Sequence, residues 1–344
     1  MPLGNYKGLL LFIGKRILFS LFVILGVMTL TFFISRVIIP DPARVWAGPH
    51  PSQATINLLT AEFHLHDPVY VQYYYYLSDL LRGNWGVSPS TGQPVLYSIE
   101  IYMPATIELA VAALLIIVLV GIPLGVLAAT NRNKLGDHFG RLVSLSGVAS
   151  PPFLVALLIQ FVFFYYLKLF PDSGGEMSAF IQAPPRVTGF LLADSLIAGN
   201  LSAFVSALDH LIMPAFALAF LTLGLMSRLV RASMLESLTS DYVRTAKAKG
   251  LKKRLVVYKH ALRNALLQPV TAMAVYVAYL LGGTVVIELI FNWPGIGRYA
   301  ANAALQFDLP AVMGTTIAFA IIVVVVNLVA DLLYAAIDPR IRLG

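Results

Sequence analysis

The stretch Ser240-Asp-Tyr-Val-Arg-Thr-Ala-Lys-Ala-Lys-Gly-Leu-Lys-Lys-Arg-Leu-Val-Val-Tyr-Lys-His-Ala-Leu-Arg-Asn-Ala-Leu-Leu-Gln-Pro269 is a basic segment between two long apolar runs. Charged side chains are costly inside hydrocarbon, so this segment belongs on a membrane surface. A helix can start at Ser240 and Asp241, and Gly250 suits the left-handed residue that ends one. A second helical run is expected from Lys252 to Leu267. The pattern therefore predicts two helices joined at a glycine, within a segment we call the 240–265 loop.

The composition supports a membrane setting. The 344 residues are 58% hydrophobic and only 12% charged, with a mean hydropathy of +0.80. A soluble domain needs more charge to cover its surface. A net charge of +7 would suggest nucleic acid for a soluble protein, but in a membrane protein it is typical of cytoplasmic loops, so no nucleic-acid partner is expected. The chain has no cysteine, which excludes disulfides and thiolate metal sites.

Apolar runs long enough to cross about 30 Å of hydrocarbon, which takes roughly 20 residues, occur six times. The predicted spans are Ile17–Ile39, Pro104–Ala129, Leu142–Phe170, His210–Val230, Leu266–Ile290 and Pro310–Ala336. The third is interrupted by Ser150-Pro151-Pro152, which we expect to bend it. Lysine and arginine gather in the loops on one side, which predicts that both termini are cytoplasmic. The fold class is therefore an all-α membrane protein with six transmembrane helices.

The same reasoning divides the chain into regions. Residues 1–39 form an N-terminal segment with the first helix, and residues 40–103 form a large external loop after it. Residues 104–336 form a five-helix core that includes the 240–265 loop, and residues 337–344 form a cytoplasmic tail. Residues 187–208 are apolar enough to suggest a further span, but Asp194, Gly199 and Asn200 interrupt them. We expect this segment to be partly helical and external, where Asn200-Leu201-Ser202 could be a glycosylation site.

Several phrases resemble a known family. Asp241 to Leu251, followed by Lys259 to Ala265, is similar to the cytoplasmic coupling loop of binding-protein-dependent ABC importers. Leu81 to Ser88, Glu288 to Gly297 and the tail Asp338 to Arg342 resemble the dipeptide/oligopeptide permease branch of that family. Arg244-Thr245-Ala246 stands where the general signature has Glu-Ala-Ala, and Leu262-Arg263 stands where it has Leu-Pro. Both departures are usual in the peptide branch.

The resemblance implies a type I ABC importer permease fold and a set of partners. These are a second permease subunit, most often a different chain, two cytosolic ABC ATPase subunits that carry ATP and Mg, an external substrate-binding protein and the lipid bilayer. The residues expected to couple to the ATPases are Asp241, Tyr242, Arg244, Thr245, Ala246, Ala248, Lys249, Gly250 and Leu251. Small Ala246 and Ala248 are expected to allow close approach of the ATPase. Possible pathway or gate residues are Ser150, Pro151, Glu288, Phe291, Pro294 and Gly295.

The chain contains no recognisable catalytic or nucleotide-binding motif. It has no phosphate-binding Gly-x-x-x-x-Gly-Lys-Ser/Thr and no hydrolase motif, so it is predicted not to be an enzyme and to bind no cofactor. The acids and histidines from Glu62 to Asp67 do not converge on a metal site, and no metal is expected. Glu108 could face headgroups or line a pathway.

Two questions stay open from the sequence. Peptides are the first expectation for the substrate, with oligosaccharides or nickel chelates as alternatives. A stand-alone secondary transporter is disfavoured because a buried chain of acids and bases is missing. A membrane scaffold that binds ATPases without moving solute also remains possible.

Overall fold

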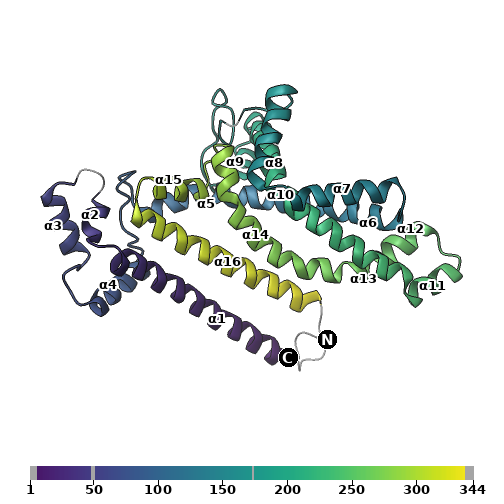
Figure 1. The fold of residues 1–344 in the computed structure, drawn as a ribbon, viewed down its shortest axis with the longest axis horizontal. Helices are drawn as coiled ribbons and strands as arrows, with labels where there is room; N and C mark the ends of the chain where they lie inside the picture. The colour runs from purple at the N-terminus through teal and green to yellow at the C-terminus, as the bar shows by residue number, and fades with distance from the viewer. Residues whose placement is uncertain (1–5, 48–50, 173, 338–344) are drawn as a thin grey trace. The chain divides into compact units, whose positions relative to one another are not determined.

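The computed structural model describes residues 6–47, 51–172 and 174–337, and in these ranges the chain is built from helices and loops. It divides into two compact units, residues 1–106 with 294–344 and residues 107–293. We call them the terminal unit and the central unit. Helix α5 (Val95–Ile116) starts in the first and ends in the second (Figure 1).

The terminal unit contains α1 (Tyr6–Phe33) with a π-helical turn Ile34–Ile38, α2 (Pro42–Trp46), α3 (Gln53–Glu62), α4 (Val69–Leu81), α15 (Ile296–Leu305) and α16 (Leu309–Ile337). The central unit continues α5 through a π-helical turn Ile117–Gly121 into α6 (Ile122–Thr130), followed by α7 (Leu135–Ala149), α8 (Pro152–Ile159) with a π-helical turn Gln160–Tyr166, and α9 (Leu191–Ile197). The rest of this unit is α10 (Leu201–Thr239), α11 (Asp241–Ala248), α12 (Lys253–Leu255), a π-helical turn Val256–Ala261, α13 (Leu262–Ala265) and α14 (Leu267–Ile290).

Five helical stretches among the described residues are long and apolar enough to cross a membrane: Gly14–Ile38, Val95–Thr130, Leu201–Thr239, Leu267–Ile290 and Leu309–Val329. Helices α7 and α8 together would make a sixth, although the chain bends by 114° between them. The predicted all-α membrane fold is confirmed, and the six predicted spans correspond to these five helices and the bent pair.

Two helix starts differ from the sequence-based expectation. Helix α5 begins at Val95 and carries Pro104 inside it, whereas the proline was expected to start the span. Helix α10 begins at Leu201, nine residues before the expected His210, because the Asn200 side-chain oxygen caps it by accepting from the Ala203 N–H at 3.0 Å. The segment 187–208 therefore holds only the short α9 and the first turns of α10.

A further helix was missed altogether. The sequence predicted no helix between the spans Leu266–Ile290 and Pro310–Ala336, but Pro294-Gly-Ile-Gly297 leads directly into α15. The buried face of α15 includes Ile296, Tyr299 and Ala303. Packing in the terminal unit therefore stabilises a helix that the residues of the preceding turn do not predict.

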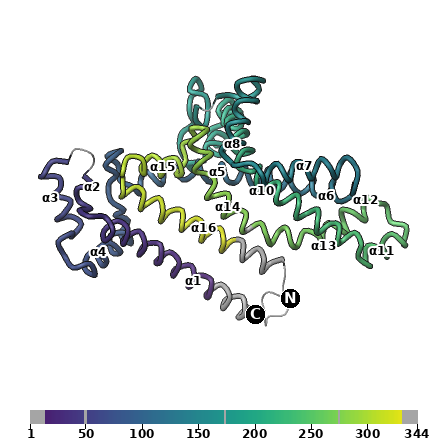
Figure 2. Tube along the Cα trace, viewed as in Figure 1, coloured from purple at the N-terminus to yellow at the C-terminus, as the bar shows by residue number. Residues whose placement is uncertain are grey.

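In the terminal unit α1 packs beside α16, as Figure 2 shows. Phe32 of α1, Tyr76 of α4 and Ile317 of α16 form one buried cluster, and the Thr31 and Tyr76 hydroxyls lie 2.9 Å apart. The Asp308 carboxylate, also buried, accepts from the Ser88 hydroxyl and from the Ser90 hydroxyl at 2.6 Å. These contacts fix the loop before α5 to the start of α16.

The central unit is organised around α10, with α6 and α7 packed along it (Figure 1). Small residues allow backbones to touch there. A Cβ on Gly125 would lie 2.6 Å from the Val230 Cβ and 2.7 Å from the Ser227 carbonyl oxygen. The Ser144 hydroxyl of α7 donates to the Gly224 carbonyl of α10 at 2.7 Å. Such contacts suit helices in lipid, where close van der Waals packing and interhelical hydrogen bonds drive association.

This packing predicts that Gly125→Ala destabilises the central unit. The added methyl group meets the fixed Ser227 backbone, and overpacking of this kind costs roughly 1–3 kcal/mol. Thermal unfolding of the purified chain in detergent measures the effect. Gly282→Ala in α14 is the matched control, since nothing lies within 4 Å of a Cβ there. Equal melting temperatures for the two variants would contradict the close approach of α6 and α10.

Candidate functional site

Helices α10 and α11 are separated by a single non-helical residue. Ser240 has φ −69° and ψ 156°, and its hydroxyl donates back to the Ser237 carbonyl at 2.5 Å. The extended conformation of Ser240 turns the chain, so α11 leaves the axis of α10 at once. The expected helix start at Ser240 and Asp241 is confirmed.

The end of α11 is a glycine-dependent cap. Gly250 has φ +74°, its N–H donates to Lys247 O at 3.0 Å, and the Leu251 N–H donates to Ala246 O at 3.3 Å. These two bonds are the pair that defines a Schellman motif, in which the left-handed residue is usually glycine. The predicted role of Gly250 as the helix terminator is confirmed.

One face of α11 packs on its own chain. Val243 is fully buried and Ala246 is 5% exposed, and α11 contacts the π-helical turn that holds the buried Val256 and Val257. Of the two alanines expected to offer close approach to an ATPase, only Ala248 is therefore on the exposed face. This inward face gives α11 a defined orientation although it has only eight residues.

Hydroxyl groups connect α11 to the helices on either side. The Ser237 hydroxyl donates to Ala261 O at 2.9 Å and lies 2.6 Å from the Tyr242 hydroxyl. Since a hydroxyl has one proton, Tyr242 must be the donor to Ser237. One turn earlier on α10, the Ser233 hydroxyl donates to the Gln268 side-chain oxygen at 2.9 Å. This bond joins α10 to α14.

The opposite face of α11 is open. The side chains exposed there are Asp241, Tyr242, Arg244, Thr245, Lys247, Ala248 and Lys249. Asp241 and Arg244 form an ion pair at 3.3 Å, but both are largely exposed, and such pairs contribute about 0–1 kcal/mol. A mixed face of tyrosine, threonine and charges on a fixed short helix fits contact with another protein better than contact with hydrocarbon.

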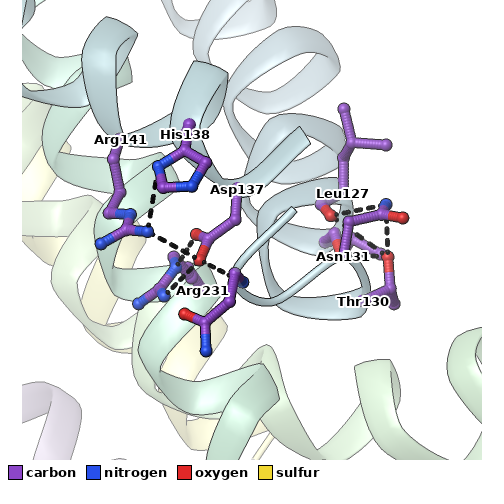
Figure 3. Close-up of polar contacts among 9 residues, drawn as sticks. Leu127, Thr130, Asn131, Asp137, His138, Arg141 and Arg231 are labelled. Carbon is purple, nitrogen blue, oxygen red and sulfur yellow. Dashed lines mark hydrogen bonds and ion pairs between the residues drawn. The ribbon is translucent and has the colours of Figure 1, made fainter. Parts of the chain in front are cut away.

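Beside this region an ion cluster joins the α6–α7 turn to α10 (Figure 3). The Asp137 carboxylate is fully buried and accepts from Arg231 through Nε at 2.7 Å and through a terminal nitrogen at 3.0 Å. Arg141 lies 3.2 Å from the same carboxylate, and the Asn133 backbone N–H donates to it at 2.9 Å. We call these four residues the Asp137 clamp.

The geometry of the clamp is that of a strong pair. A two-point arginine–carboxylate contact fixes direction as well as distance, and the backbone donor satisfies a further lone pair. Arg231 lies on α10 less than three turns before Ser240, so the clamp holds the α6–α7 hairpin close to the start of α11. Arg231 and Asp137 are 94 positions apart, so no local pattern in the sequence pairs them.

A second feature of the central unit is a cavity of about 310 Å³ between α8, α10 and α14. Ser150 lies in its wall at the bend before α8, together with Thr222 of α10 and Tyr279 and Gly283 of α14. Most other lining residues are apolar, and Tyr279 is 69% exposed. The cavity brings one of the expected pathway residues, Ser150, beside residues of two further helices.

The remaining expected pathway residues lie elsewhere. Pro151 is exposed at the bend, while Glu288 and Phe291 at the end of α14 are buried within the central unit, at 0% and 2% exposure. Pro294 and Gly295 belong to the terminal unit. A pathway role for these five residues stays a prediction.

Glu108 accepts from the Leu192 N–H at 2.9 Å, so it caps the start of α9.

Known proteins match this chain over nearly its full length. Residues 121–343 match the family described as binding-protein-dependent transport system inner membrane component, and residues 9–110 match the N-terminal model of such membrane components. A probable D,D-dipeptide transport system permease protein of Escherichia coli K12 is 44% identical over 94% of each chain.

Two further relatives extend the likeness. A dipeptide transport system permease protein of Alkalihalophilus pseudofirmus is 37% identical, over 95% of this chain and 98% of its own. An oligopeptide transport system permease protein of Bacillus subtilis is 36% identical, over 96% of this chain and 99% of its own. With its multiple membrane helices and the matched family model covering more than half of its residues, the chain belongs to the inner membrane components of binding-protein-dependent transport systems.

Proposed function

We propose that this chain is the permease subunit of an ATP-driven importer and forms half of the pathway for peptides delivered by an external binding protein. The observation that carries the proposal is α11, a short helix with one buried face and one open polar face, set between two membrane helices. Its relatives that are named for dipeptide and oligopeptide transport support peptides over oligosaccharides or nickel chelates.

The open face of α11 receives a cytosolic ATPase subunit in this proposal. Tyr242, Arg244 and Thr245 give it shape and hydrogen-bonding groups, and Ala248 leaves space for a side chain of the ATPase. ATP and Mg would be bound by the ATPases, of which the complete importer has two. Binding of ATP draws the ATPases together, and α11 moves with the subunit that holds it.

The path of that movement runs through bonds within the central unit. The hydroxyls of Ser237 and Tyr242 join α11 to the end of α10, and Ser233 with Gln268 joins α10 to α14. The Asp137 clamp adds the α6–α7 hairpin to the same body. A pull on α11 is therefore passed to the helices around the 310 Å³ cavity instead of being lost in a loose loop. Inward-open and outward-open states are then two ends of one equilibrium that ATP and the binding protein both bias.

The cavity beside Ser150 faces a second permease subunit in this proposal. One chain supplies one wall, and a partner permease of the same family supplies the other. The apolar lining with a few hydroxyls gives weak and general contacts to a peptide, so the external binding protein would do most of the selection.

The Gly250 cap provides the first test of coupling. Gly250→Val forces a β-branched residue into a left-handed conformation, which costs about 1–2 kcal/mol, although the surroundings leave room for a side chain. We expect peptide transport and substrate-stimulated ATP hydrolysis by the assembled importer to fall together. Gly250→Asn is the matched control, because asparagine tolerates this conformation, and it should retain most activity. Unchanged transport by the valine variant would show that α11 does not transmit force.

The Asp137 clamp provides the second test. Asp137→Asn leaves Arg231 without its carboxylate, and loss of one partner of a buried pair costs on the order of 3–5 kcal/mol. We expect a lower melting temperature and a lower ratio of substrate-stimulated to basal ATP hydrolysis. Arg231→Lys keeps the charge but loses the two-point contact, so its effect should be intermediate. Asp67→Asn breaks an exposed pair with His64 and is the control. A clamp variant with wild-type stability and stimulation would exclude this role.

The orientation can be tested directly because the chain has no cysteine of its own. We expect Thr91→Cys and Phe180→Cys to react with a membrane-impermeant maleimide in intact cells, since both positions are exposed and external in the proposed topology. Lys249→Cys should react only after the membrane is permeabilised. Labelling of Lys249→Cys in sealed cells would place the 240–265 loop outside and reject the coupling role.

A further inference from the structure

The terminal unit holds a cavity that the transport mechanism above does not use. It has a volume of about 50 Å³ and lies between the end of α1, α2, α4 and the start of α16. The side chains that give it chemical character are Arg36, Trp46, Phe63, Asp79 and Trp85. The cavity is thus aromatic on its walls and carries one cation and one anion.

Arg36 is held rigidly at this cavity. Its terminal nitrogen donates to the Phe63 carbonyl at 2.8 Å, and its guanidinium carbon lies 4.7 Å from the Trp46 ring centre and 5.2 Å from the Phe63 ring centre. The two rings are themselves packed edge to face with centres 4.9 Å apart. Aromatic faces attract a guanidinium electrostatically but do not replace hydrogen-bond acceptors for all of its N–H groups. The Arg36 side chain is therefore held in place while some of its N–H groups can still donate hydrogen bonds.

Two donors on side chains that line this cavity lack an acceptor. The Arg36 Nε–H and the Trp46 Nε1–H are buried, and neither has a hydrogen-bond partner in the described part of the chain. Trp46 as a whole is only 3% exposed. A buried donor left unpaired costs roughly 1–3 kcal/mol, and native structures contain few of them. Two such groups on adjacent side chains that line one cavity indicate a binding site for the acceptor oxygen of a ligand.

Asp79 supplies the opposite character. Asp79 lines the same cavity, and its negative charge acts on the Arg36 guanidinium. With Arg36 and Asp79 together the cavity has no net charge, which favours neither a simple anion nor a simple cation. A group that brings both an acceptor oxygen and a positively charged donor satisfies both ends.

We propose that this cavity binds an α-amino-acid head group. Its ammonium lies against Asp79, and its neighbouring carbonyl or carboxylate oxygen accepts from Arg36 and Trp46. The head group has five non-hydrogen atoms or fewer apart from its side chain, and the cavity has space for about three to five waters at 10–15 Å³ each. The aromatic walls of Phe63 and Trp85 accommodate the carbon atoms. The head group is that of a free amino acid or of the first residue of a peptide.

This inference does not depend on ATP-driven transport, because binding is measured on the isolated full-length chain. The chain has three tryptophans, Trp46, Trp85 and Trp293, so a ¹⁵N-tryptophan sample in lipid nanodiscs gives three indole N–H signals. Trp46→Phe identifies the signal of Trp46 by its loss. Trp293 belongs to the central unit and serves as the reference within the same spectrum.

Titration with glycine is expected to shift the Trp46 signal in a saturable way and to leave the Trp293 signal in place. Glycylglycine binding as well means that the site accepts peptide N-termini, whereas glycine alone means that it is limited to free amino acids. Acetate, methylammonium and N-acetylglycine each lack one of the paired groups and should not saturate the site. Asp79→Asn should weaken glycine binding at least about tenfold, since a charge-assisted hydrogen bond is lost, while Asp67→Asn should not.

Three outcomes would overturn the proposal. Acetate that saturates the site as well as glycine would make it a simple anion site. An unshifted Trp46 signal with every compound would leave the two donors to ordered water alone. Equal glycine affinity in Asp79→Asn and the unaltered chain would remove the ammonium contact on which the assignment rests.

Discussion

The central unit depends on how closely α6 and α7 approach the backbone of α10. In lipid, helices gain little from burying apolar side chains, so direct packing and hydrogen bonds between them hold a bundle together. Gly125 brings α6 against Ser227 and Val230, and the Ser144–Gly224 bond does the same for α7. Three helices are thereby joined along their lengths, and the Asp137 clamp fixes them at the end beside α11. A loose hairpin at this place would absorb any force applied to α11.

In the proposed mechanism, the unbroken helix α10 carries movement from α11 to the rest of the central unit. The helix has 39 residues and a length of about 58 Å at 1.5 Å per residue. Only Ser240 separates it from α11, and the Ser237–Tyr242 contact bridges that residue. Along its course α10 contacts α8 and α14, which complete the wall of the 310 Å³ cavity. In the proposed mechanism, α10 therefore connects the open face of α11 with the wall of this cavity.

The sequence predicted those parts that depend on local chemistry. The apolar runs predicted the membrane helices, and Gly250 predicted the end of α11, because each rests on residues a few positions apart. It failed where a local rule was outweighed by packing. Pro104 lies inside α5 rather than at its start, and α15 follows a phrase that resembles a simple turn. For α10 the sequence showed Asn200 as an interruption of an apolar segment, whereas in the structure the same residue caps the helix.

Contacts between distant residues could not be predicted at all. Arg231 and Asp137 are 94 positions apart, and one sequence contains no sign that they meet. The cavity of the terminal unit is a similar case, since Arg36 lies near the end of the first span and Asp79 follows a run of tyrosines. Read separately, Arg36 is a charge at a membrane boundary and Asp79 an ordinary loop acid. Only the fold brings them to one small space with two unpaired donors, and only then does their chemistry become specific. Local sequence patterns thus identify this chain as a helical membrane protein. Its specific contacts between distant residues become visible only in the tertiary structure.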